Sequence, residues 1–191
     1  MNYCKNANSI NLHEEKAGEL LKEIPDSISL GQFHNPMNPL SHYQTTGPEI
    51  YKQLDGQVDY LVAGAGSGGT FSGVVKFLKE RNENLQGVLA DPYGSIIGGG
   101  EHGSYNIEGI GNDFIADTMD MQLVDRVIKI TEQEAFESAR ALASREGIFA
   151  GPSSGAALAA VRKLIESGGR GTIVTIFPDR GDRYFSKGLY D

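Results

Sequence analysis

The 191-residue chain has one cysteine, no tryptophan and no long apolar run. Its cysteine, Cys4, cannot form an internal disulfide. No cluster of cysteine and histidine offers a zinc site, so we expect no metal. Nothing approaches the roughly 20 apolar residues of a membrane-spanning helix, which argues against a membrane partner. The first residues lack the apolar core of a secretory signal, and we therefore expect a cytoplasmic protein.

Basic side chains are also scarce relative to acidic ones. The chain has 17 Lys and Arg against 25 Asp and Glu, which gives a net charge of −8 with neutral histidines. Binding to phosphate backbones needs clustered basic residues, so a nucleic-acid partner is not expected. The abundant residue is glycine, at 25 of 191 positions, nearly twice its usual share of about 7%. We expect this glycine in tight turns and ligand-binding loops.

Short apolar runs alternate with helix-like patterns along the whole sequence. Capping-box patterns predict two of the helix starts, one at Asn11 with Glu14 and one at Thr131 with Glu134. This alternation predicts an α/β fold, with a mostly parallel sheet and helices on both faces. Without a long linker or a repeat, residues 1–191 are expected to form a single domain. The expected strands are residues 28–33, 58–63, 86–91, 124–130 and 172–177.

Residues 64–70 form a glycine-rich loop between an expected strand and an expected helix. Such a loop collects unpaired backbone N–H groups at the positive end of a helix dipole, a setting that binds phosphate. A purely structural turn is one interpretation. A dinucleotide site is another, because three glycines match G-x-G-x-x-G and Asp91 ends the next strand, where a ribose-binding acid belongs. A phosphate monoester site is the third, because Ser67 and Thr70 add hydroxyls to the glycines.

Two further segments have the character of a site. Residues 151–157 also lie between a strand and a helix start, and Ser153 there is either an ordinary cap or a donor to a polar ligand atom. Residues 108–114 combine glycines with an apolar anchor and are typical of a flexible flap.

With these segments in view, the chain resembles the cystathionine β-synthase and cysteine synthase family of pyridoxal-phosphate enzymes. The resemblance runs from about Gln32 to Tyr184. It is carried by Gln32-Phe33, by Glu108-Gly109-Ile110-Gly111 with Asp113-Phe114, and by Asn38-Pro39-Leu40-Ser41-His42-Tyr43 followed by Thr45-Thr46. These motifs look closer to the cystathionine β-synthase branch.

The resemblance implies a fold, a cofactor and a set of site residues. The fold would be the larger lobe of a two-lobed, tryptophan synthase β-like enzyme of fold type II, and the cofactor would be pyridoxal 5′-phosphate. Ser153 would hydrogen-bond the pyridine nitrogen. Gln32 would lie near the substrate carboxylate, and Gly109 and Ile110 would line the active-site face. The cofactor phosphate would be held by Gly66, Ser67, Gly68, Gly69 and Thr70.

Asp179 is an alternative partner for the pyridine nitrogen, because a carboxylate would keep that nitrogen protonated. The resemblance favours Ser153. A neutral hydroxyl leaves the ring a weaker electron sink, which suits β-elimination.

Two of the family's segments have no counterpart here. They are the lysine segment, of the type Asn-x-x-x-Ser-x-Lys, and the substrate-carboxylate loop, of the type Thr-Ser-Gly-Asn-Thr-Gly. The resemblance therefore assigns no catalytic residue to this chain, because the lysine carries the covalent and acid–base roles. We expect the chain to be the later part of such an enzyme, without β-replacement activity by itself.

The activity implied for the enzyme is β-replacement on serine or O-acetylserine. A leaving group departs from the β-carbon and a thiol adds, which gives cystathionine from homocysteine or cysteine from sulfide. The expected partners are these small amino-acid and thiol substrates and a second copy in a homodimer. A nicotinamide dinucleotide-binding domain and a non-catalytic remnant that binds a partner are the alternatives.

Overall fold

The computed structural model describes residues 9–190, so Cys4 and the first residues considered for a signal segment lie outside the described part. The chain divides into two compact units, residues 1–32 and residues 33–191. Each unit is described by itself below. The expected single domain over residues 1–191 remains a prediction.

The first unit contains helix α1 (Ser9–Glu23) and the segment that follows it. Asp26 has a left-handed backbone with φ 58°, which turns the chain after the helix. The strand predicted at residues 28–33 is wrong, because the structure forms no strand over these described residues. Ile28 and Leu30 are 83% and 75% exposed. Their apolar side chains suggest a strand, but a strand also needs a neighbour to take up its backbone hydrogen bonds.

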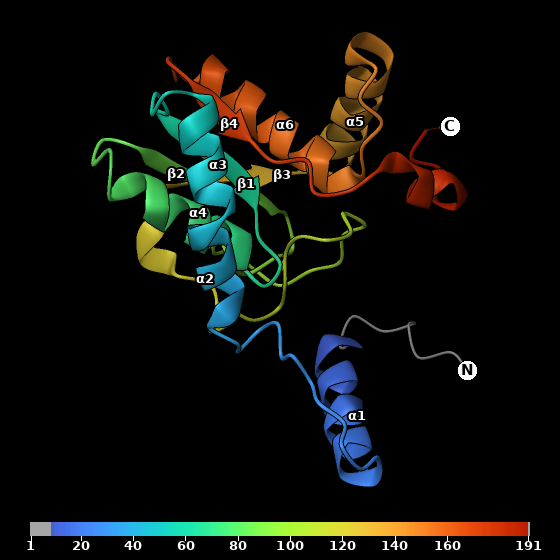
Figure 1. Cartoon of the computed structure of the whole chain (residues 1–191). Helices are drawn as coiled ribbons and strands as arrows, with labels where there is room; N and C mark the ends of the chain where they lie inside the picture. The colour runs from blue at the N-terminus through green and yellow to red at the C-terminus, as the bar shows by residue number, and fades with distance from the viewer. Residues whose placement is uncertain (1–8, 191) are drawn as a thin grey trace. The chain divides into compact units, whose positions relative to one another are not determined.

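The second unit is built on a four-stranded parallel sheet with the order β3-β2-β1-β4 (Figure 1). Its register pairs Val62 with Val88 in the centre of the sheet and Tyr60 with Ile173 beside it. The strands are β1 (Tyr60–Gly64), β2 (Gln86–Pro92), β3 (Arg126–Ile130) and β4 (Ile173–Thr175).

Helices cover both faces of this sheet because successive strand residues point to opposite sides. Leu61 and Ala63 of β1 belong to one buried cluster, whereas Val62 between them belongs to the other. The first cluster includes residues of α2 (Met37–Gln44), α3 (Thr46–Gln53) and α4 (Gly69–Lys79). The second includes residues of α5 (Glu132–Glu146) and α6 (Pro152–Glu166), which lie side by side in Figure 1.

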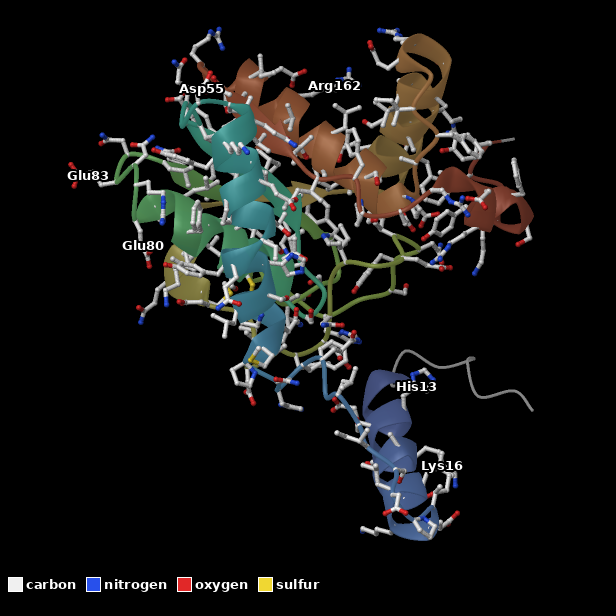
Figure 2. All side chains as sticks on the ribbon, in the orientation of Figure 1. His13, Lys16, Asp55, Glu80, Glu83 and Arg162 are labelled. Atoms are coloured by element: carbon white, nitrogen blue, oxygen red, sulfur yellow. The ribbon has the colours of Figure 1, made fainter. Side chains whose placement is uncertain are left out.

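This architecture confirms the predicted α/β class with a parallel sheet and helices on both faces. The predicted capping box at Thr131 is also confirmed, since Glu134 N donates to Thr131 Oγ1 and Thr131 N donates to Glu134 Oε2. Charged side chains such as Glu83 and Arg162 lie at the periphery of the unit (Figure 2). Two short 3-10 segments, η1 (Met121–Leu123) and η2 (Gly181–Lys187), complete the fold. None of the helices within residues 9–190 has the length and apolar character that a membrane crossing requires.

Candidate functional site

The loop between β1 and α4, residues 64–70, lies at the carboxyl edge of the parallel sheet, where ligands of α/β folds bind. Gly68 caps α4 with φ 80°, a left-handed conformation that glycine adopts without strain, and a Cβ there would collide with Met119. Within the described chain, the N–H groups of residues 66–70 donate no hydrogen bond. These free donors at a helix N-terminus form a cradle for an anion.

Two side chains of α2 hold the hydroxyls of this loop. Asn38 Nδ2 donates to Ser67 Oγ at 3.0 Å. His42 Nε2 lies 3.0 Å from Thr70 Oγ1, and His42 Nδ1 lies 2.9 Å from Thr46 Oγ1. Burial lowers the pKa of His42, so the ring is neutral at pH 7, with one nitrogen donating and the other accepting.

The segment around Gly109 and Ile110 runs alongside the same loop. Gly111 N donates to Ala65 O at 2.7 Å, and Asn112 Nδ2 donates to Gly66 O at 2.9 Å. A Cβ on Gly66 would lie 3.0 Å from Gly109 O. The expected flap, residues 108–114, is therefore tied to the glycine loop through Gly111 and Asn112.

Ser153 is the second residue of α6 and is 3% exposed. A Cβ on Gly109 would lie 3.6 Å from Ser153 Oγ, so Gly109 lies between Gly66 and Ser153. The structure thus brings together the predicted residues of loop 64–70, Gly109, Ile110 and Ser153. Gln32 is the last residue of the first unit, and its assignment to the substrate stays a prediction.

Asp179, the alternative to Ser153, lies near the start of α6. Its Oδ2 accepts a hydrogen bond of 2.5 Å from the Tyr184 hydroxyl. Its Oδ1 is buried without a partner in the described chain and occupies the space that a Cβ on Gly151 would need. Burial, and then the Asp179 carboxylate, raise the pKa of Tyr184. Tyr184 therefore remains a neutral donor that fixes this carboxylate.

Asp91 is 1% exposed and already engaged. Its Oδ2 accepts from Lys129 Nζ at 2.5 Å and from Gly98 N at 3.0 Å. Its Oδ1 has no partner in the described chain but is buried as well, so neither carboxylate oxygen is accessible to a ribose hydroxyl in this structure. The structure thus removes the acid on which the dinucleotide interpretation depended.

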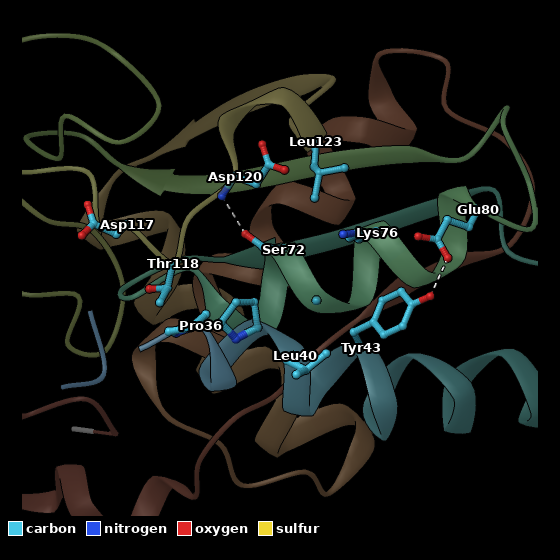
Figure 3. A pocket seen from close by; sticks show the side chains of 12 residues that line it. Pro36, Leu40, Tyr43, Ser72, Lys76, Glu80, Asp117, Thr118, Asp120 and Leu123 are labelled. Atoms are coloured by element: carbon cyan, nitrogen blue, oxygen red, sulfur yellow. Dashed lines mark hydrogen bonds between the residues drawn. The ribbon is translucent and has the colours of Figure 1, made fainter. Parts of the chain in front are cut away.

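A cavity of about 510 Å³ lies on the outer side of α4, between α2 and η1 (Figure 3). Polar groups on its wall bond to one another: Tyr43 Oη donates to Glu80 at 2.6 Å, and Asp120 N donates to Ser72 Oγ at 2.9 Å. Tyr43 and Ser72 thus bond within the wall itself, whereas the N–H groups of residues 66–70 donate no hydrogen bond within the described chain. Among the described residues, no group of three or more His, Cys, Asp and Glu could hold a metal ion.

Sequence reasoning missed the residues that support the loop, namely Asn38, His42 and Asn112. The first two are part of the motif that carried the resemblance, but the pattern does not show what they contact. Thr70 lies 28 positions from His42 in the sequence. Only the packing of α2 against α4 brings the two together.

Comparisons with known proteins agree with this geometry. A family model described as pyridoxal-phosphate dependent enzyme matches residues 4–179. An O-acetylserine dependent cystathionine beta-synthase from Bacillus subtilis is 46% identical over 178 residues, which are 93% of this chain and 58% of that protein. A cysteine synthase from Helicobacter pylori strain J99 is 46% identical over 177 residues, 92% of this chain and 58% of that protein.

A solved structure gives the same result in three dimensions. The crystal structure of an O-acetylserine dependent cystathionine beta-synthase from Helicobacter pylori superposes with a TM-score of 0.91 at 42% identity. The match covers 96% of this chain and 60% of that one. The chain therefore spans less than two thirds of the length of these relatives.

Proposed function

Because the chain belongs to the family of pyridoxal-phosphate dependent enzymes, we propose that it forms the cofactor-holding lobe of a β-replacement enzyme. The reaction is replacement of the β-substituent of serine or O-acetylserine by a thiol, which gives cystathionine or cysteine. The names of its relatives, an O-acetylserine dependent cystathionine beta-synthase and a cysteine synthase, support this substrate class. The observation that carries the proposal is the meeting of loop 64–70, Gly109 and Ser153.

The cofactor phosphate is assigned to the cradle at residues 66–70. Its free N–H groups can donate hydrogen bonds to an anion, and the positive end of the α4 dipole attracts negative charge. The hydroxyls of Ser67 and Thr70 are oriented by Asn38 and by neutral His42. A small phosphate monoester suits this set of donors.

Ser153 is assigned to the pyridine nitrogen of the cofactor. Ser153 is buried, and its hydroxyl lies beside Gly109, which in turn lies beside Gly66. Asp179 is held by Tyr184 and lies next to Gly151, so we assign it a supporting role at the start of α6. When bound, the cofactor supplies the electron sink that lets a β-substituent leave.

The substrate is assigned to the exposed side of Gly109. Ile110 is 7% exposed, packs against Gly64 and holds the flap in place. Gln32 is assigned to the substrate carboxylate. We further propose that the enzyme is a homodimer, as the family resemblance implies, that it is cytoplasmic, and that residues 1–191 act as one functional domain.

A binding experiment on the 191-residue chain tests this assignment. The probe is pyridoxine 5′-phosphate, which keeps the phosphate and ring nitrogen but has no aldehyde to react with surface lysines. We expect calorimetry to show binding that inorganic phosphate competes away, and no binding of pyridoxine without the phosphate. Ser153→Ala should weaken binding about 2- to 10-fold, the loss of one hydrogen bond.

Ser144→Ala is the matched control, because Ser144 is exposed on α5 and bonds only its own helix at Ala141 O. It should bind the probe as the unmodified chain does. The proposal fails if the unmodified chain does not bind the probe. The assignment of Ser153 alone fails if both serine variants bind equally well.

A further inference from the structure

Lys129 of β3 reaches across to the end of β2 and places its ammonium group among three oxygen atoms. Lys129 Nζ lies 2.5 Å from Asp91 Oδ2, 2.8 Å from Ser95 O and 3.5 Å from Pro92 O. The Lys129 side chain is 20% exposed and that of Asp91 is 1% exposed. The lysine thus fills a largely buried cation site at the start of loop 93–112.

Ser95 connects this cation site to the other end of the loop. Its backbone oxygen accepts from Lys129, and its Oγ accepts from Asn112 N at 3.2 Å. Asn112 Nδ2 in turn donates to Gly66 O at 2.9 Å. A continuous chain of hydrogen bonds therefore runs from Lys129 to the cradle.

The conformation of the loop depends on a small number of anchors. Ile97 and Ile107 are 1% exposed, and Ile96 N donates to Asn112 O at 2.9 Å. The loop holds seven glycines between residues 94 and 111, and glycine loses more backbone entropy on ordering than any other residue. Gly99 and Gly100 are exposed, and a Cβ on Gly99 would meet nothing within 4 Å. The Lys129 contact at Ser95 adds an anchor at the start of this glycine-rich loop, and it bears on where Gly109 and Ile110 lie.

We propose that Lys129 is a positioning residue: its ammonium ion, bound by Asp91 and Ser95, sets the place of Gly109 and Ile110 against the cradle. It touches neither cofactor nor substrate, and it acts through Ser95 and Asn112. The effect of Lys129 on cofactor binding rests on the function proposed above, whereas its effect on the order of loop 93–112 is independent of that function.

The test must separate this role from simple charge compensation. Lys129→Met leaves the buried Asp91 without a cation, which destabilises the whole fold. The double variant Lys129→Met/Asp91→Asn removes that charge and keeps an oxygen that can accept from Gly98 N. We expect the double variant to regain most of the unfolding free energy but not the order of the loop.

Hydrogen–deuterium exchange on the full chain measures the order of the loop. In the double variant, peptides covering residues 92–112 should exchange at least about tenfold faster than in the unmodified chain. The Lys129 contacts are then missing, so the loop can open locally without breaking them. Lys79→Met is the matched control. Lys79 is 22% exposed and bonds Asp125 Oδ1 at 2.8 Å, away from loop 93–112. It should leave that exchange unchanged.

Chemical rescue gives a readout that a loss of packing would not move. Lys129→Ala leaves room for a small cation at the position of Nζ. Ammonium or methylammonium chloride should slow exchange in residues 92–112 towards the original rate, whereas tetramethylammonium at equal ionic strength should not. The proposal is overturned if the double variant exchanges like the unmodified chain, or if no small cation slows exchange in Lys129→Ala.

Binding of pyridoxine 5′-phosphate by the same variants connects the loop to the site. We expect several-fold weaker binding in the double variant and unchanged binding in Lys79→Met. If the unmodified chain does not bind the probe, the proposed function fails while the exchange result still decides the role of Lys129.

Discussion

His42 shows how a single side chain can support a ligand loop that belongs to another helix. It lies on α2, and its two ring nitrogens contact Thr70 in the loop and Thr46 at the start of α3. In the neutral imidazole one nitrogen donates and the other accepts, so one threonine hydroxyl accepts and the other donates. A protonated ring has only donors, so it would lose one of the two contacts unless the threonine turned its hydroxyl.

The lowered pKa of His42 predicts how stability depends on pH. Burial holds the folded-state pKa below the ordinary value of 6.5, so the unfolded chain takes up the proton first as the pH falls. The stability that neutral His42 contributes is complete above about pH 6.5 and is lost as the pH falls through its folded-state pKa. Urea unfolding at pH 7.5 and pH 5 should show a smaller loss for His42→Gln than for the unmodified chain.

His102→Gln is the control for that measurement, because His102 is exposed on loop 93–112. It should lose as much stability between the two pH values as the unmodified chain. Equal losses in the His42 and His102 variants would show that His42 is not the group responsible.

The supporting residues could not be predicted at this scale from the sequence. The glycines and hydroxyls of residues 66–70 predict an anion site because the strand, the loop and the helix follow one another directly in the sequence. Asn38 and His42 lie in a separate helix, and their role depends on how α2 packs on α4. The same holds for Lys129 and Asp91, which meet only because β2 and β3 pair with Asp91 opposite Lys129.

At the scale of elements, the beginning of α5 is specified by its own residues. Thr131 Oγ1 accepts from Glu134 N at 3.3 Å, and Glu134 Oε2 accepts from Thr131 N at 2.9 Å. Thr131→Ala should lower the unfolding free energy by about 1 kcal/mol, the usual cost of losing a helix cap. Urea unfolding measures this loss directly.

Ser144→Ala on the same helix serves as its control, because the Ser144 hydroxyl caps nothing. Its effect should stay within about 0.5 kcal/mol, as for most exposed positions. If Thr131→Ala lost no more free energy than Ser144→Ala, the capping box would contribute nothing to stability.

The strands could be predicted where the chain also contains the neighbouring strands with which they pair. β1 and β2 overlap the expected runs 58–63 and 86–91 and end one residue later. β3 and β4 are shorter than the expected runs 124–130 and 172–177. Residues 28–33 have the same apolar character and yet form no strand. An apolar run shows that a segment needs burial, but only pairing with another strand makes it part of a sheet.

At the scale of the whole molecule, the site arises from topology. Loop 64–70 and the start of α6 both lie at the carboxyl ends of parallel strands or at helix starts, so each was recognisable as a possible site. That Gly109 lies between Gly66 and Ser153 follows from the return of loop 93–112 across the edge of the sheet. The family resemblance was confirmed because its motifs cover most of the chain.

The division into two units predicts where a protease cuts first. Leu30 is 75% exposed in a segment without regular structure, whereas Leu61 in β1 is fully buried. Both buried clusters of the sheet lie in residues 33–191, so loss of the first unit removes none of their side chains. A low dose of chymotrypsin should therefore cleave near Leu30 and leave a fragment that starts close to Gly31 and resists further digestion.

Mass spectrometry of the products identifies the fragment, and circular dichroism shows whether it keeps its structure. In urea, where the sheet is unfolded, the same enzyme should cut throughout the chain and no fragment should accumulate. If chymotrypsin cut inside β1 or α4 as early as it cut near Leu30, the sheet would depend on the first unit.

Because the cradle at residues 66–70 lies wholly in the second unit, a resistant fragment should also bind pyridoxine 5′-phosphate. Loss of binding on cleavage would place part of the phosphate site in residues 1–32.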